Sequence, residues 1–354
     1  MQVQEPQLSS KQSIANHFKT GVLIVNLGTP DSPSTPDVRK YLREFLMDGR
    51  VIDFPFVFRW MLVNLIIAPF RSPKSAKVYQ ELWTDRGSPL KFYGEDVERM
   101  LQAQLGTEYD VKLAMRYQNP SMDAGLEAFR KAGYKKIIVV PFFPQYASAT
   151  TGSVYEKTME IVKNWQIIPE ISFVNTFYDH PKFVQFFTEA AQQYMAKHEY
   201  DYFMFSYHGL PERQIRKGDC TGNTCKLGSC CDTIHAMNQY CYRAQCHETT
   251  RLLAKSLGLK EGDYMTTFQS RLGKDPWIQP YTDATIKEMV AKGKKKILVF
   301  SPAFVADCLE TTIEIGEEYK ELFEELGGEH WQLVESLNNS PLWVDLLEDL
   351  IKKA

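Results

Sequence analysis

The chain has 354 residues and a formal net charge of −3, with 44% hydrophobic and 24% charged residues. This composition excludes disorder, collagen and a coiled coil as the main architecture, and the length predicts two domains or one large α/β unit. The slightly negative charge argues against nucleic acid as a partner.

Two segments bear on localisation. Residues 1–20 are polar and lack the apolar core of a signal peptide, so we expect the mature chain in the cytoplasm. Residues 54–70 are the most lipophilic stretch, but Pro55, Arg59 and Asn64 interrupt it. Because the stretch is also shorter than the roughly 20 residues that a span needs, it is predicted to touch a membrane rather than to cross one.

Short apolar runs alternate with helix-period segments, which is typical of repeated βα units. Helices are expected between the strands, such as 36–47, with Thr35 as its N-cap, and a last helix opened by Ser340 and Pro341. Continuous apolar strands joined by helices favour a mostly parallel sheet covered on both faces. The predicted strands are 22–26, 110–115, 136–140, 171–175, 202–206, 264–268, 296–300 and 332–335.

The two halves of the chain resemble each other. Residues 133–140 are similar to 293–300, and a strand followed by Gly-x-Pro occurs at Gly28 and again at Gly209. The offset between the two pairs is not constant. We interpret the difference as an insertion in the second half, between residues 211 and 293, with the cysteine-rich segment as the candidate.

Chemistry is expected just beyond the strands, since doubly wound sheets bind ligands at the carboxyl ends of their strands. His208 follows the strand 202–206 on a tight turn, where an imidazole suits proton abstraction or Fe²⁺ ligation. The alternative is a hydrogen-bonded structural histidine.

A helix that starts near Cys308 carries an acidic stripe. Its glutamates recur at helical spacing, so they share one face: Glu310, Glu314, Glu317 and Glu321. Like charges at this spacing oppose one another, so the stripe needs a function or ample solvent. A solvated face is the alternative for the last two, whereas Glu310 lies nearest the strand end and is favoured for proton exchange.

Six of the seven cysteines lie between Cys220 and Cys246, and Cys308 stands alone. This distribution is unlike the disulfide framework of a small secreted chain. It favours a metal or an iron–sulfur cluster in a reducing compartment.

Several motifs together resemble the ferrochelatase family over nearly the whole chain after about residue 20. They are 26–30, 38–46 with 51–53, 87–90, 115–117, 144–146, 151–153, 206–211, 301–304 and 307–311. The resemblance implies an α/β fold of two similar Rossmann-like halves, each a parallel four-stranded sheet flanked by helices, in a chelatase-like arrangement. We expect an N-terminal half at 20–175, a C-terminal half at 176–340 with a cysteine-rich insert at 217–247, and a C-terminal helix at 341–354.

The activity implied by the resemblance is that of a lyase that inserts Fe²⁺ into protoporphyrin IX to form protoheme. It assigns His208, Glu310 and Glu314 to catalysis, with His208 and Glu310 as ligands of the substrate Fe²⁺. Aromatic and apolar walls would bend the macrocycle and expose its nitrogens. Candidates for walls and propionate contacts are Leu27, Phe56, Phe58, Trp60, Arg116, Tyr117 and Tyr146. The stretch 54–70 would form an apolar lip, or else pack on its own domain.

Some members of this family hold a 2Fe-2S cluster, and the cysteine-rich insert resembles a place for one. Four thiolates are needed, and the favoured set is Cys225, Cys230, Cys231 and Cys241, with Cys220 and Cys246 in reserve. Tetrahedral zinc is the rival occupant, with His235 or His247 able to replace a thiolate.

Three alternatives to the implied activity stay open. One is a chelatase for coproporphyrin III, one a chelatase for a cobalt-corrin precursor, and one a heme or iron–sulfur sensing protein without turnover. Leu27 favours protoporphyrin, because coproporphyrin enzymes resemble one another in having Tyr at that position. The sequence does not distinguish a monomer from a homodimer.

Overall fold

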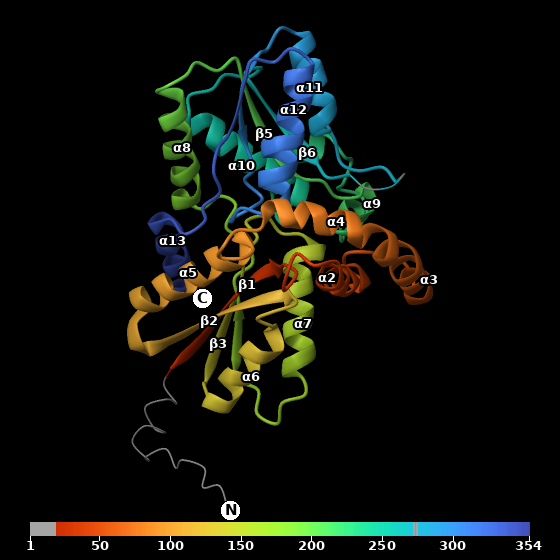
Figure 1. The fold of residues 1–354 in the computed structure, drawn as a ribbon. Coiled ribbons are helices and arrows are strands. Elements are labelled where there is room, and N and C mark those ends of the chain that lie inside the picture. The colour runs from red at the N-terminus through yellow and green to blue at the C-terminus, as the bar shows by residue number, and fades with distance from the viewer. Residues whose placement is uncertain (1–18, 272, 274) are drawn as a thin grey trace, which may run out of the picture.

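The computed structural model describes residues 19–271, 273 and 275–354, and in these residues the strands form two four-stranded sheets. Their strand orders are β2-β1-β3-β4 and β6-β5-β7-β8, and every neighbouring pair is parallel. The two sheets lie in separate halves of the molecule (Figure 1). The predicted α/β fold of two similar halves, each with a parallel four-stranded sheet, is therefore confirmed.

All the predicted strands are present. In the first sheet they are β1 (Thr20–Gly28), β2 (Tyr109–Tyr117), β3 (Lys136–Pro141) and β4 (Glu170–Phe173), and in the second β5 (Tyr202–His208), β6 (Tyr264–Gln269), β7 (Lys296–Phe300) and β8 (His330–Leu333). The edge strands β4 and β8 begin and end earlier than predicted. They start on polar residues, Glu170 and His330, whose N–H groups donate to Lys135 and Lys295, so an apolar run does not mark their first residue.

Helices cover both faces of each sheet. In the first half they are α2 (Thr35–Met47), α3 (Phe56–Met61), η1 (Leu62–Ile67), α4 (Ala68–Leu82), α5 (Pro89–Leu105), η2 (Gly106–Glu108), α6 (Met122–Ala132), η3 (Ser148–Gly152) and α7 (Ser153–Val162). In the second they are α8 (Pro181–Met195), α9 (Glu212–Lys217), η4 (Ser229–Cys231), α10 (Tyr242–Ser256), α11 (Thr282–Ala291), η5 (Leu309–Glu318), α12 (Tyr319–Glu325) and α13 (Pro341–Lys353).

Both helix starts that the sequence predicted are present. The last helix, α13, begins after Ser340 as expected, with the Ser340 side chain accepting from the N–H of Trp343. Helix α2 has Pro36 in its first turn, but its cap is Ser34 and not Thr35. The Ser34 hydroxyl accepts from the N–H of Asp37, while the Thr35 backbone is already helical.

The expected insertion in the second half is wrong. Between β1 and β2 the chain forms α2, α3, η1, α4 and α5, whereas between β5 and β6 it forms only α9, the cysteine-rich insert and α10 in the described residues. The first half therefore holds the extra length. The offset falls from 181 residues at Gly28 and Gly209 to 160 at Gly133 and Gly293, so the sequence itself places the extra length in the first half and the interpretation assigned it to the wrong one.

The largest buried core cluster runs through both halves and includes α13. The ring of Trp343 lies 5.0 Å from that of Phe142 and 5.3 Å from that of Phe177, between centroids, and α13 also packs on α5 and α8. The C-terminal helix thus ties the two halves together, while the predicted domain boundaries stay a prediction. Among the described helices, none combines the length and the apolar character that crossing a bilayer requires.

Candidate functional site

The carboxyl ends of the two sheets face each other. Beyond β3, the Tyr146 N–H donates to Gln245 on α10 at 2.6 Å, and the Gln145 side chain donates to the Pro302 carbonyl beyond β7 at 3.3 Å. Leu309, at the start of η5, packs against the same cluster as Leu27 at the end of β1. The fold therefore gathers the strand-end residues of both halves in one region.

His208 is the last residue of β5, and its ring is held by its own turn. Its Nδ1 lies 2.6 Å from the Gly209 carbonyl oxygen. A carbonyl can only accept, so in the neutral imidazole Nδ1 carries the proton and Nε2 keeps its lone pair. The ring lies 6.4 Å from that of Trp277, and the His208 carbonyl accepts from the Tyr242 hydroxyl at 2.8 Å. The bond to Nδ1 orients the ring, and the bond from Tyr242 fixes the backbone that carries it.

Gln269 connects the histidine strand to the acidic helix. It is the register partner of His208 on β6. Its side-chain amide donates to the Glu310 carbonyl oxygen at 3.2 Å and to Glu314 Oε2 at 3.1 Å. The catalytic candidates His208, Glu310 and Glu314 therefore lie at one end of the second sheet, as predicted from their positions after strands.

Glu314 is the most firmly held of these carboxylates. Its Oε1 accepts from the Ser270 N–H and the Tyr319 hydroxyl, each at 3.0 Å. Its Oε2 accepts from Gln269 and from the Ser270 hydroxyl. A carboxylate with this many donors is fixed in position. The sequence indicated Glu314 but not Ser270 or Tyr319, which no motif marks.

Three residues of the acidic stripe, Glu310, Glu314 and Glu317, lie on a π-helix, which the predicted α-helical spacing did not allow for, and Glu321 lies on α12. In η5 the Tyr319 N–H donates to the Glu314 carbonyl, five residues back. Glu318, outside the predicted stripe, lies near Glu314 and Glu321. Partial burial, followed by the charges of Glu314 and Glu321, raises the pKa of Glu318. Glu317, Glu318 and Glu321 are exposed, while Glu310 and Glu314 are half-buried.

Cys308 lies directly before η5, buried beside Glu310. Burial, then the Glu310 charge and a hydrogen bond to that carboxylate, raise the pKa of the thiol. Tyr41 on α2 and Tyr79 on α4, both buried, hydrogen-bond each other close to the same two residues. The first half thus contributes the apolar floor beneath Glu310.

Arg116 and Tyr117 belong to a buried network around Asp48. Asp48 Oδ2 accepts from Arg116 Nη2 and the Tyr117 hydroxyl, each at 2.8 Å, and from the Ser153 hydroxyl at 2.5 Å. Burial opposes ionisation, but these bonds and the Arg50 N–H outweigh it and lower the pKa of Asp48.

This network changes the interpretation of two predicted contacts. Tyr117 is fully buried, so a position on an exposed wall does not fit it. The Arg116 guanidinium is already paired, with 13% of its side chain exposed against 4% for Asp48. Both residues therefore belong to the buried support of the site and not to its surface. Asp48 was missed because its partners, Arg116 and Ser153, are distant in sequence.

Leu27 and Tyr146 keep partly exposed positions at the strand ends. Leu27 follows β1 residues that are fully buried, and Tyr146 has its ring 5.9 Å from that of Tyr240. Apolar side chains at such places are suited to contact a flat ligand. Their predicted role as wall residues is compatible with this geometry and stays a prediction.

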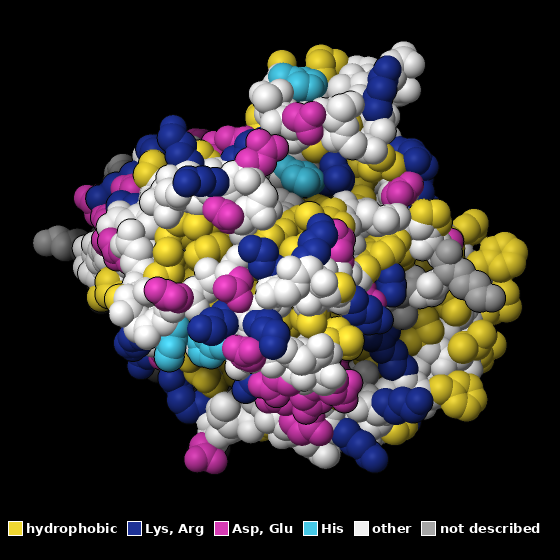
Figure 2. Space-filling view, turned by 90° about the horizontal axis from the view of Figure 1, so that it is seen from above, with side chains coloured by type: hydrophobic (Ala, Val, Ile, Leu, Met, Phe, Trp, Pro, Cys, Tyr) yellow, Lys and Arg dark blue, Asp and Glu magenta, His cyan; other side chains and the backbone are white. Residues whose placement is uncertain are grey.

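The lip, residues 54–70, projects as α3, η1 and the start of α4. Its exposed apolar side chains include Phe56, Val57 and Phe58, at 62%, 63% and 63%. Hydrophobic side chains gather on the right-hand side of Figure 2, where Figure 1 places α3. The same stretch also packs on its own domain through Val63, which is fully buried, so it combines a packed face with an exposed one.

Four of the cysteines in the insert are neighbours. Cys230 Sγ lies 3.8 Å from Cys231 Sγ, Cys225 hydrogen-bonds Cys230, and Cys231 hydrogen-bonds Cys241. Within the described ranges, no group of three or more His, Cys, Asp or Glu side chains is arranged to hold a metal ion as it stands. The favoured set is therefore gathered but not closed around a centre.

The remaining candidates of the insert differ in surroundings. Cys220 is exposed, while Cys246 is fully buried on α10 and hydrogen-bonds Tyr242. His247 has a buried Nε2 without a partner, and burial lowers its pKa to about 3. Asp219 fastens the start of the insert: hydrogen bonds from the Cys225 N–H and from neighbouring groups lower its pKa to about 2.

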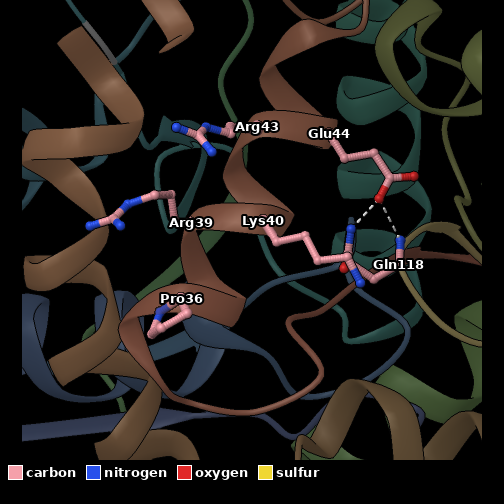
Figure 3. A pocket seen from close by; sticks show the side chains of 6 residues that line it. All are labelled: Pro36, Arg39, Lys40, Arg43, Glu44 and Gln118. Carbon is pink, nitrogen blue, oxygen red and sulfur yellow. Dashed lines mark hydrogen bonds between the residues drawn. The ribbon is translucent and has the colours of Figure 1, made fainter. Parts of the chain in front are cut away.

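A shallow cavity of about 480 Å³ lies outside this region, beside α2. Figure 3 shows Arg39 and Arg43 on one side of the helix, away from Glu44, which accepts from Gln118. The cations do not converge on one point, so the cavity is a surface groove. It contains none of the predicted site residues.

Comparison with known proteins agrees with this arrangement. The sequence model of the ferrochelatase family matches residues 19–354. The ferrochelatase of Coxiella burnetii (strain Dugway 5J108-111) is 43% identical over 342 residues, which cover 97% of this chain and 96% of the relative. The ferrochelatase of Legionella pneumophila (strain Lens) is 45% identical over 336 residues, which cover 95% and 99%.

Two solved structures share the fold. SirB from Bacillus subtilis with Fe³⁺ has a TM-score of 0.55 at 13% identity and covers 95% of each chain. The sirohydrochlorin chelatase SirB from Bacillus subtilis subspecies spizizenii, in complex with cobalt, has a TM-score of 0.53 at 12% identity, covering 95% and 94%. These two show a chelatase-like fold, and the family match over nearly all of the sequence shows that this chain belongs to the ferrochelatase family.

Proposed function

We propose that this ferrochelatase inserts Fe²⁺ into protoporphyrin IX at the facing strand ends, with His208, Glu310 and Glu314 carrying the chemistry. Membership of the family makes the chain a lyase that inserts ferrous iron into a tetrapyrrole in heme biosynthesis. The observation that carries the residue assignment is the Gln269 side chain, which joins the strand of His208 to both glutamates.

The reaction requires two protons to leave the macrocycle as the metal enters. Fe²⁺ forms bonds to the four pyrrole nitrogens while two N–H bonds break. Glu310 and His208 Nε2 hold the ion before it enters, since Nδ1 is engaged with the Gly209 carbonyl. As the ion passes to the pyrrole nitrogens, the lone pair of Nε2 is released and accepts one of the protons. A carboxylate of the acidic helix accepts the other.

Binding would supply the strain that exposes the nitrogen lone pairs. Leu27 and Tyr146 are the proposed wall contacts. Arg116 and Tyr117 support the site from the buried network that they form by hydrogen-bonding to Asp48. The apolar floor beneath Glu310 limits water near the ion, which strengthens the electrostatic contacts there.

A metal-insertion assay with two porphyrins tests this function. Fe²⁺ or Zn²⁺ is offered with protoporphyrin IX or with coproporphyrin III, and insertion is followed by absorption. Faster insertion into protoporphyrin supports the proposal. Preference for coproporphyrin would favour the first alternative, and binding without insertion would favour a sensing protein.

We also propose that Cys225, Cys230, Cys231 and Cys241 bind a 2Fe-2S cluster, with zinc as the rival occupant. Pairwise contacts support this set: Cys225 with Cys230, Cys230 with Cys231, and Cys231 with Cys241. The four thiols would have to move together to surround one centre. When bound, such a group supplies electron transfer or a structural crosslink for a segment without its own core.

Visible absorption and metal analysis of the purified chain separate the two occupants. A brown protein with acid-labile sulfide supports the cluster, whereas a colourless one with zinc rejects it. Cys225→Ser is expected to lose the chromophore, while the matched control Cys220→Ser retains it because Cys220 is exposed and outside the group. Loss in the control alone would assign a different ligand set.

We propose a cytoplasmic chain with peripheral contact between the lip and the inner face of the membrane. The exposed Phe56, Val57 and Phe58 support this contact, since apolar side chains enter the interface between headgroups and acyl chains. Centrifugal partition with liposomes tests it. The unmodified chain is expected in the pellet and Phe56→Ser/Phe58→Ser in the supernatant; equal partition would contradict the contact.

A further inference from the structure

The start of the lip is largely exposed. From Val51 to the residue before Val63, no side chain is buried, although Val51 and Ile52 pack against the core cluster of the first half. Arg59 Nη1 donates to the carbonyls of Ile52 and Phe54, at 3.1 and 2.9 Å. Contacts from another part of the chain add to those that this stretch makes with its own half.

Helix α9 of the second half supplies such contacts. Arg213 donates from Nη2 and Nε to Asp53 Oδ1 at 2.8 and 3.0 Å, and Lys217 donates to Asp53 Oδ2. Gln214 donates to the Val51 carbonyl at 3.2 Å, and the Arg213 guanidinium lies 5.3 Å from the centroid of the Phe54 ring. Helix α9 therefore contacts the Val51 carbonyl, the Asp53 carboxylate and the Phe54 ring at the base of the lip.

The central carboxylate of this contact is well sheltered. The Asp53 side chain is 14% exposed, compared with 34% for Arg213 and 63% for Lys217. Burial opposes ionisation, but the hydrogen bonds from Arg213 and Lys217 outweigh it and lower the pKa of Asp53. Ion pairs that are partly removed from water contribute more than fully exposed ones.

Helix α9 is itself fixed to the turn that carries His208. It begins directly after that turn, and the Glu212 N–H donates to the Pro276 carbonyl at 2.9 Å. The Gly209 N–H donates to the Gln269 carbonyl at 2.8 Å. The turn and α9 therefore form one unit, so a contact with α9 fixes the lip relative to His208.

We propose that Asp53, Arg213 and Lys217 form a latch that holds the lip against the half bearing His208 and sets how fast a bound porphyrin leaves. The proposal rests on the proposed function. The junction is not filled: a cavity of about 200 Å³ lies beside the ion pairs. Its lining consists of Phe54, Glu212, Arg213, Arg216, Asp275 and Pro276. Side chains do not fill this junction, and the ion pairs connect the lip to α9 across it.

Asp53→Asn tests the latch, because it removes the charge at nearly constant size. Zinc protoporphyrin is formed in a single turnover, and its transfer to excess apomyoglobin is followed by absorption. The variant is expected to release the product about tenfold faster, the size of effect that a half-buried ion pair supplies. Insertion within the single turnover is expected to change less than twofold.

Salt gives an independent readout. Higher ionic strength is expected to speed release from the unmodified chain and to have less effect on Asp53→Asn, because the latch charge is already absent. Arg216→Gln is the matched control: it breaks the pair with Glu212 on the same helix but leaves Asp53 with both cations. Lys217→Gln, which keeps the Arg213 pair, is expected to give a smaller increase.

Release from Asp53→Asn within twofold of the unmodified chain would overturn the latch, as would equal acceleration by Arg216→Gln. If Asp53→Asn does not fold, Lys217→Gln decides by the same measure. An unmodified chain that binds no protoporphyrin would instead contradict the proposed function, so the two failures are distinguishable.

Discussion

The two halves of the molecule repeat the same strand ends. After the second strand of each sheet, the Met115 N–H donates to the Pro120 carbonyl at 2.6 Å, and the Phe268 N–H donates to the Pro280 carbonyl at 2.8 Å. Both residues also form an isolated parallel bridge just beyond. Met115 and Phe268 therefore occupy equivalent positions, which allows the two sites to be compared residue by residue.

The comparison shows that an apolar residue in the first half occupies the position equivalent to the histidine in the second. Met115 pairs with Asn26 and Phe268 with Tyr207, so the next residues, Leu27 and His208, are equivalent. The central strand β1 therefore ends in an apolar side chain that can make only van der Waals contacts. The equivalent strand β5 ends in an imidazole that can accept a proton.

The following pair extends the contrast. Arg116 and Gln269 are equivalent by the same register, and each reaches a π-helical segment of its own half. Arg116 donates to Ser153 beside η3, whereas Gln269 donates to Glu314 in η5. In the first half the residue at this position holds the buried network around Asp48 together. In the second half it orients carboxylates. We infer that the first half binds and the second reacts.

The largest expected effect comes from removing the proton acceptor. His208→Ala is expected to lower insertion by about 10³-fold, as for the loss of a general base, while protoporphyrin binding followed by fluorescence stays within a few fold. The control His198→Ala changes an exposed histidine whose ring lies 4.6 Å from that of His330, at the amino end of β8 and away from the carboxyl strand ends. Near-normal insertion by His208→Ala would contradict the inference that the second half carries the reaction.

Glutamates inside and outside the site sharpen the comparison. Glu314→Gln keeps the shape but removes the charge that four donors stabilise, and insertion is expected to fall about 10²-fold. Glu317→Gln changes an exposed neighbour on the same π-helix and is expected to stay within a few fold. Equal losses in steady-state insertion would instead make the whole stripe one functional unit.

The first half should respond in stability and not in chemistry. Asp48→Asn leaves the buried Arg116 without its counter-charge, so the free energy of unfolding in urea is expected to fall by about 3 kcal/mol. Asp31→Asn, which breaks an exposed pair with Lys40, is expected to cost less than about 0.5 kcal/mol. A similar loss for both would refute the special role of the buried network.

The same carboxylate gives a pH dependence of definite sign. The folded-state pKa of Asp48 is lowered, so its contribution is complete above the ordinary carboxyl pKa of about 4 and is lost as the pH falls through the lowered value. The stability difference between the unmodified chain and Asp48→Asn is therefore expected to shrink in acid.

The sequence allowed prediction of what local pattern determines. Apolar runs located every strand, and the position of His208 after one of them indicated the strand end where the candidate site lies. Contacts between distant segments were not predictable: Asp48 meets Arg116 and Ser153 only once the halves fold, and Asp53 meets α9 across the two halves. The π-helix was also missed, since its glutamate spacing fits an ordinary α-helix equally well.

The smallest expected effect concerns Leu27, the counterpart of His208. Leu27→Tyr adds a hydroxyl at a partly exposed strand end, where it can contact a polar substituent of the macrocycle without altering the proton acceptor. The ratio of kcat/KM for protoporphyrin to that for coproporphyrin is expected to fall about tenfold, the scale on which one pocket contact discriminates between substrates. The single-turnover rate with protoporphyrin should change little if, as we infer, the first half binds and the second reacts. A changed single-turnover rate with an unchanged kcat/KM ratio would mean that Leu27, the counterpart of His208, takes part in the chemistry itself.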